Sequence, residues 1–234
     1  MIEDTELETY LYISPNKFGI YIYDIKKSIC LLKEEYNFEN LTQNIEIQYL
    51  SEFLEKNIFK IEKLIGKFIK NIFLVIESKK ITNFHLGINK KNYDVVFNKK
   101  YIENLLTEAK DLFKENYHNQ KIIHFLVNNY LINGLNHSSF VENLHGNNIS
   151  LEVQFICIPN NLVLTLDKIL EKFQIKIIKY MDGIYIKTFF NESNLGFEEM
   201  VHKIKSGYNE NEIILIPKKN KNIGFFEKFF QLFG

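Results

Sequence analysis

Residues 10–24 read Tyr-Leu-Tyr-Ile-Ser-Pro-Asn-Lys-Phe-Gly-Ile-Tyr-Ile-Tyr-Asp and predict a β-hairpin near the start of the chain. The apolar run before Ser14 and the alternation from Gly19 onward both have the character of strands. Between them, Ser14-Pro15-Asn16-Lys17 has the composition of a tight turn. A further strand is expected around Ser28–Lys33.

The segment after the hairpin predicts a long amphipathic helix over residues 44–70. Its charged residues fill one face, and its apolar residues recur every three or four positions along the other, namely Ile47, Leu50, Phe53, Leu54, Ile58, Ile61, Leu64, Ile65 and Phe68. The apolar run Asn71–Ile76 then predicts a strand. Helix and strand in alternation are typical of an α/β layered fold.

Residues 81–157 predict a second unit with its own order of elements. The expected elements are strands at 81–88 and 94–97, a helix at 100–116, and strands at 121–132 and 150–158. Between the last two strands, the polar stretch Gly134–Asn148 is predicted to be a long surface loop.

The pattern then returns to helix and strand. A helix is expected at Asn161–Phe173 and a strand at Ile175–Tyr180, followed by a turn at Asp182-Gly183. A short helix is expected at Phe197–Lys205. Residues 212–217 have the pattern of a short strand or an extended stretch.

The composition argues against several classes of protein. The 234 residues carry 29 basic and 29 acidic side chains, and all the basic ones are lysines. The absence of arginine at zero net charge argues against a dedicated nucleic-acid binder. The longest apolar run, Ile72–Ile76, is far too short for a membrane-spanning helix. The acidic N-terminus lacks the features of a signal peptide, so the protein is expected to reside in the reducing cytoplasm.

Signals for catalysis and for metal binding are poor. The six histidines have no paired ligand spacing, and Cys30 and Cys157 form neither a disulfide framework nor a zinc set. No glycine-rich phosphate loop or nucleophile motif occurs. The sequence therefore predicts no catalytic residue, no metal site and no cofactor.

The C-terminal residues predict an amphipathic helix that lies on a membrane surface. Residues 218–222 form a basic linker, and residues 223–234 hold five phenylalanines. The expected membrane-binding residues are Ile223, Phe225, Phe226, Phe229, Phe230 and Phe233, with Lys218, Lys219, Lys221 and Lys228. Such a helix binds by burying its apolar face while its lysines attract anionic lipid. The alternative is a terminal helix that docks on the protein's own core.

The order of elements and several local strings resemble FtsA, the actin-like membrane tether of the bacterial division ring. The start of that family is similar to Leu11–Asp24, the helix Ile45–Lys70 and the strand that leads to Ser78. The family's inserted SHS2-type domain is similar to His124–Gly134 and to the run Ser150–Gln154, which follows Asn143-Leu144-His145-Gly146. The C-terminal amphipathic helix is a family feature too.

The departures from the family concern its nucleotide site. Actin-like ATPases bind phosphate with an Asp-x-Gly-Thr/Ser pattern, and the matching stretch here is Tyr12-Ile13-Ser14-Pro15. A tyrosine cannot ligate magnesium as a carboxylate does, and Pro15 removes a backbone N–H. The family's second phosphate motif should follow Tyr185 and is absent, as is its second lobe. Tyr12, Ser14 and Pro15 therefore resemble a degenerate phosphate loop, and no ATP binding is expected.

The resemblance implies an α/β fold: a partial actin-like, or ribonuclease H-like, subdomain with an inserted α+β domain of the SHS2 type. Residues 1–80 and 159–190 would form the subdomain and 81–158 the insert, followed by a tail and basic linker (191–222) and the membrane helix (223–234).

The implied function is a non-enzymatic adaptor of cell division, peripheral on the cytoplasmic face of the bacterial inner membrane and at midcell during division. Its implied partners are an anionic membrane surface, FtsZ-type filaments or later septal proteins, and further copies of itself; no nucleic acid is expected. The alternatives are a PilM-like scaffold of pilus assembly and a degenerate actin-fold ATPase.

Overall fold

The fold is that of a computed structural model, which describes residues 6–38, 45 and 47–213. The chain divides into two compact units. Unit 1 consists of Met1–Thr82 and Ile158–Tyr208, and unit 2 consists of Asn83–Cys157 and the residues from Asn209 onward. Each unit has its own sheet and is described by itself.

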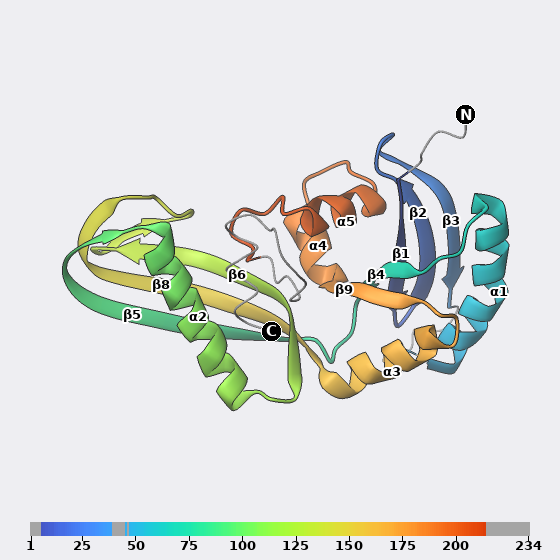
Figure 1. The fold of residues 1–234 in the computed structure, drawn as a ribbon, viewed down its shortest axis with the longest axis horizontal. Helices are drawn as coiled ribbons and strands as arrows, with labels where there is room; N and C mark the ends of the chain where they lie inside the picture. The colour runs from blue at the N-terminus through green and yellow to red at the C-terminus, as the bar shows by residue number, and fades with distance from the viewer. Residues whose placement is uncertain (1–5, 39–44, 46, 214–234) are drawn as a thin grey trace. The chain divides into compact units, whose positions relative to one another are not determined.

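Unit 1 is built on a five-stranded sheet with the order β3-β2-β1-β4-β9 (Figure 1). The first three strands form an antiparallel meander, while β4 lies parallel to β1 and β9 lies parallel to β4. The bounds are β1 (Leu7–Ser14), β2 (Lys17–Asp24), β3 (Ile29–Asn37), β4 (Asn71–Ile76) and β9 (Lys176–Asp182). The predicted hairpin and strand thus belong to a mixed sheet. With the predicted helix, this sheet gives the α/β fold class that the actin-like resemblance implies.

In the described part of unit 1, four helices pack on this sheet: α1 (Ile47–Ile65), α3 (Asn160–Glu171), α4 (Gly183–Phe189) and α5 (Phe197–Lys205). In Figure 1, α1 and α5 lie on opposite sides of the sheet. The predicted apolar stripe of α1 is buried at Leu50, Phe53 and Leu54. The prediction that this helix extends to residue 70 is wrong. It ends at Ile65 because Gly66 takes a φ of 70°, a left-handed conformation that stops a helix.

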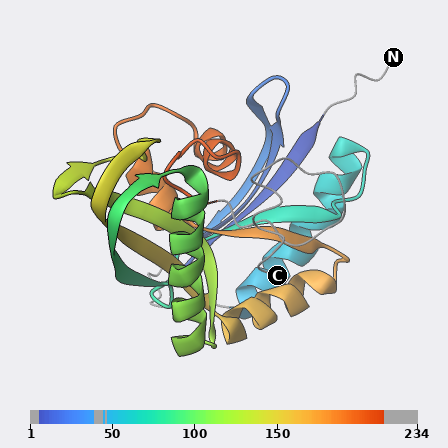
Figure 2. The ribbon, with the colours of Figure 1, turned by 60° about the vertical axis from the view of Figure 1, so that its left-hand side comes forward.

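The described part of unit 2 consists of one helix and a four-stranded sheet with the order β5-β8-β6-β7. Figure 2 shows this helix, in green, in front of the sheet. The bounds are β5 (Thr82–Phe97), α2 (Lys99–Asn116), β6 (Gln120–Ile132), β7 (Leu135–His137) and β8 (Leu144–Pro159). Asn98 caps α2 by accepting a hydrogen bond from the Tyr101 amide. Phe97, Phe125 and Phe155 fill the core. The order of strand, helix and two long strands agrees with an SHS2-type insert, which stays a prediction.

Three further predictions about local structure are wrong. The strands expected at 81–88 and 94–97 are one strand, β5. Polar residues in its middle interrupt the alternation from which a strand is predicted. The expected loop Gly134–Asn148 contains β7 and the start of β8. The turn at Asp182-Gly183 is the beginning of α4. Of the extended stretch 212–217, the described residues are Glu212, which forms a bridge to Leu126, and Ile213.

Candidate functional site at the carboxyl edge of the five-stranded sheet

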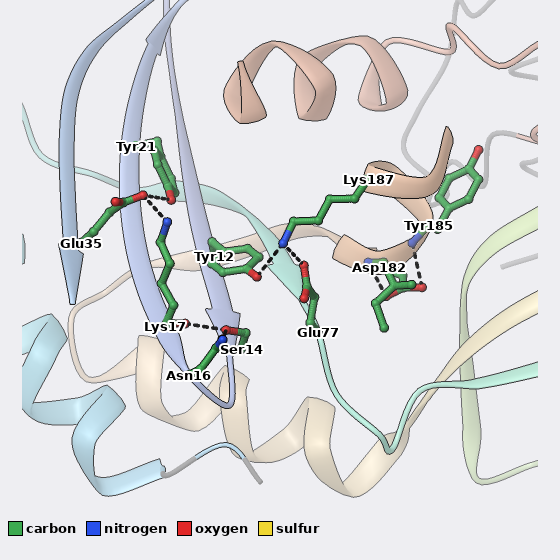
Figure 3. Close-up of polar contacts among 11 residues, drawn as sticks. Tyr12, Ser14, Asn16, Lys17, Tyr21, Glu35, Glu77, Asp182, Tyr185 and Lys187 are labelled. Atoms are coloured by element: carbon green, nitrogen blue, oxygen red, sulfur yellow. Dashed lines mark hydrogen bonds and ion pairs between the residues drawn. The ribbon is translucent and has the colours of Figure 1, made fainter. Parts of the chain in front are cut away.

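Three neighbouring parallel strands of unit 1 end at one edge of the sheet. The register pairs Ile13 with Ile76 and Ile76 with Asp182, so Ser14, Glu77 and Asp182 come together at this edge. The Glu77 amide also donates to the Ile13 carbonyl over 2.8 Å. Ligands of open α/β sheets bind outside the carboxyl ends of such strands. This edge is therefore the place to test for a functional site (Figure 3).

The hairpin at this edge is closed tightly. Pro15 and Asn16 are the two turn residues between Ser14 and Lys17, which pair with each other. The Ser14 hydroxyl lies 2.6 Å from Asn16 Oδ1 and 3.1 Å from the Lys17 carbonyl oxygen. Phosphate loops use successive backbone N–H groups, and of the two turn residues only Asn16 has one. The predicted degenerate loop residues thus end β1 in a short turn, whose Ser14 hydroxyl bonds within the turn itself.

Lys187 of α4 lies between the side chains of Tyr12, on β1, and Glu77, which follows β4. Its Nζ donates to the Tyr12 hydroxyl over 3.0 Å and lies 2.6 Å from Glu77 Oε1. The same ammonium lies 5.0 Å from the centre of the Tyr12 ring. Burial works to lower the pKa of Lys187, but the Glu77 carboxylate and the Tyr12 hydroxyl outweigh it, so this pKa lies above its usual value. A side chain of the protein thus supplies the positive charge at this edge.

Asp182 is the N-cap residue of α4. Its carboxylate accepts hydrogen bonds from the Ile184 and Tyr185 amides over 3.1 and 3.2 Å. Gly183 is needed beside it, because a Cβ there would lie 2.7 Å from Glu77 Cγ. Among the described residues, no three His, Cys, Asp or Glu side chains are grouped as a metal site would need. The carboxylate of Asp182 therefore starts a helix here.

A cavity of about 130 Å³ lies next to the Tyr12 ring. It is lined by Tyr12, Lys17, Tyr21, Lys33, Glu35, Lys187 and Phe197. Pockets for drug-sized ligands and cofactors measure roughly 300–1,000 Å³, so this cavity is too small for a nucleotide. Glu35 already pairs with Lys17 at 2.5 Å and with Lys33 at 3.1 Å, and it accepts from the Tyr21 hydroxyl. Burial raises the pKa of Glu35, but these three partners bring it down to about 2.

Helix α5 covers the aromatic face of the sheet above this edge. The Phe197 ring lies 5.1 Å from that of Tyr12 and 5.5 Å from that of Tyr21. Val201 and Ile204 of the same helix are buried with Tyr10, Tyr12 and Met181. At the far end, Glu8 accepts from Tyr10 and pairs with His202 and Lys205. Residues 183–205 therefore form a lid of two short helices on the sheet.

Sequence reasoning placed Tyr12, Ser14 and Pro15 at this edge but gave no role to Glu77 or Lys187. A local signal for these two residues is missing, because their contact depends on the parallel pairing of strands distant in sequence. The predicted membrane-binding residues lie outside the described residues: Lys218, Lys219, Lys221, Ile223, Phe225, Phe226, Lys228, Phe229, Phe230 and Phe233. Among the described helices, none combines the length and apolar character that crossing a bilayer requires.

No family model and no curated protein matches the chain. Several solved structures are similar to it. One is the PilM–PilN type IV pilus biogenesis complex, with 9% identity and a TM-score of 0.49, over 79% of this chain and 50% of that one. Another is the cytoplasmic domain of EpsL, an inner membrane component of the type II secretion system of Vibrio cholerae. It has 8% identity and a TM-score of 0.40, over 77% of this chain and 59% of that one.

A third is a Bacteroides thetaiotaomicron protein with an actin-like ATPase fold and unknown function. It has 17% identity and a TM-score of 0.34, over 84% of this chain and 61% of that one. The chain spans between half and about three fifths of the length of these three structures. Likenesses of this size assign the chain to no family.

Proposed function

We propose that this chain is a non-enzymatic scaffold, peripheral to a membrane, that binds other proteins. The observation that carries the proposal is the closed carboxyl edge of the five-stranded sheet. Lys187 occupies the space between Tyr12 and Glu77, and the two-residue turn at Pro15 leaves no amide cradle for phosphate. An actin-like half closed in this way is suited to presenting surfaces rather than to turning over a nucleotide.

A nucleotide-binding measurement tests the non-enzymatic part of the proposal. Isothermal titration of the intact chain with Mg-ATP should give no heat of binding at millimolar nucleotide. A Lys187→Ala variant serves as a matched comparison, because it removes the side chain that fills the edge. Micromolar affinity in the intact chain would overturn the proposal in favour of an actin-fold ATPase.

The membrane part of the proposal is supported by the sequence of residues 218–234. In a helix, these phenylalanines would share one face, and four lysines lie within the same segment. Burial of one such side chain in the headgroup boundary is worth roughly 1.5–3 kcal/mol. Phe230→Asp and Gln231→Asp are a matched pair, because they introduce the same charge on opposite faces. We expect Phe230→Asp to lower co-sedimentation with anionic vesicles at least tenfold and Gln231→Asp to leave it nearly unchanged.

The finer question is which assembly the scaffold serves. Our first candidate is a pilus or secretion platform. Two of the structural neighbours belong to such assemblies, although likenesses of that size show no function. The second candidate is the division ring, which the FtsA-like strings and the tail favour. Cross-linking the intact tagged chain in cells, followed by mass spectrometry, separates the two. Enrichment of neither class of protein over a tagged control would contradict both.

A further inference from the structure

The described chain finishes in unit 2, although its last helix belongs to unit 1. Helix α5 and Tyr208 are part of unit 1, and the residues from Asn209 onward are part of unit 2. Residues 209–211 form a turn, in which the Glu212 amide donates to the Asn209 carbonyl, and the chain then bridges to β6 at Glu212. We call the segment Asn209–Ile213 the strap.

Backbone hydrogen bonds join the end of the strap to β6 through an isolated β-bridge. The Val127 amide donates to the Asn211 carbonyl over 2.9 Å, and the Ile213 amide donates to the Phe125 carbonyl over 2.8 Å. Leu126 and Glu212 form the antiparallel bridge between these two bonds. The strap therefore covers the part of β6 that precedes its pairing with β7. Covering the edge of a strand blocks its pairing with other chains.

Buried side chains hold the strap in one register. The His124 ring and the Glu212 carboxylate are 0% and 3% exposed, and His124 Nδ1 lies 2.8 Å from Glu212 Oε1. This contact is a hydrogen bond between two buried side chains 88 residues apart in sequence. Asn211 Nδ2 donates to the Ser138 carbonyl over 2.7 Å, and Ile213 packs against the core of unit 2. A shift by one residue would leave a buried polar group without its partner, which is costly.

We propose that the strap fixes the start of the C-terminal tail on unit 2. When the tail binds a membrane, unit 2 is then kept close to the membrane surface. This inference rests on the membrane function proposed above for residues 223–234. Between Ile213 and that segment lie residues 214–222, which can span at most about 30 Å. If the strap were released, the tail would be attached at Tyr208 of unit 1. The bound tail would then keep unit 1, and not unit 2, close to the membrane.

Hydrogen exchange of the full chain, followed residue by residue by NMR, tests the strap itself. In Glu212→Ala, which leaves the His124 ring without its carboxylate, we expect the Val127 amide to exchange at least tenfold faster. Glu210→Ala is the matched control, because Glu210 is an exposed residue of the same segment. If Glu212→Ala does not fold, Ile213→Pro removes one strap hydrogen bond and leaves the His124–Glu212 contact in place. Unchanged exchange at Val127 in the folded variants would overturn the inference.

A vesicle experiment then separates the strap from the tail. A fluorophore is placed on α2 through Glu115→Cys in a Cys30→Ser background, and the acceptor is a lipid in phosphatidylcholine–phosphatidylglycerol vesicles. We expect Glu212→Ala to pellet with vesicles as well as Glu210→Ala does but to lose at least half of the energy transfer. Equal energy transfer in the two variants would overturn the proposed role of the strap. Failure of the parent protein to pellet would instead overturn the membrane function.

Discussion

At the scale of single residues, the contact that closes the sheet edge is the one between Lys187 and Glu77. Breaking a buried ion pair costs 3–5 kcal/mol, but the Lys187 side chain is half exposed. We therefore expect Lys187→Met to lower the free energy of unfolding by about 1–2 kcal/mol, measured by urea denaturation. Lys203→Met, which breaks the looser 3.5 Å pair with Glu199, should cost less than about 0.5 kcal/mol. Equal losses would mean that the edge pair has no special role.

Glu35 gives a prediction at the same scale about pH. Its three partners hold its pKa near 2 in the folded protein, below the ordinary value of 4.5. A lowered folded pKa stabilises the protein above the unfolded pKa, and this contribution is lost as the pH falls from about 4.5 to about 2. Glu35→Gln should therefore reduce the acid sensitivity of unfolding between pH 5 and pH 3. Urea midpoints at both values measure this, with Glu171→Gln, an exposed change on α3, as the control.

At the scale of elements, the accuracy of sequence prediction depended on the length and amphipathicity of each segment. The bounds of α5, Phe197–Lys205, were predicted in full because its apolar residues recur at helical spacing. Helix α4 was missed because it has seven residues and its strongest signal is the capping residue Asp182. Strand β5 was divided because its polar middle hides the alternation on which strand prediction depends.

Helix α4 positions Lys187, so its cap can be tested on its own. Asp182→Ala removes the acceptor of two backbone hydrogen bonds and should cost about 0.5–2 kcal/mol in the free energy of unfolding. Asp182→Asn keeps an acceptor oxygen and should lose less than half of that amount. Thermal unfolding followed by circular dichroism compares the two variants. A loss of equal size in both would show that the charge of Asp182, and not the cap, is what matters.

At the scale of the whole molecule, the fold class could be predicted because it rests on local periodicity and on the order of elements. The candidate site could be predicted only in part. Tyr12, Ser14 and Pro15 are neighbours in sequence, whereas Glu77 and Lys187 reach Tyr12 through the pairing of β4 with β1 and the turn from β9 into α4. Contacts of this kind follow from topology, so sequence pattern alone does not reveal them.

The proposed function makes a prediction about the place of the protein in the cell. A fluorescent fusion of the intact chain should lie at the cell envelope, and one truncated after Pro217 should be diffuse, because truncation removes the basic linker and the phenylalanine face. Phe230→Asp should behave as the truncation does, and Gln231→Asp as the intact chain does. Discrete envelope spots would favour a pilus or secretion platform, and a midcell band the division ring. A diffuse signal from the intact chain would contradict the membrane function, while the closed sheet edge and its nucleotide test would stand independently.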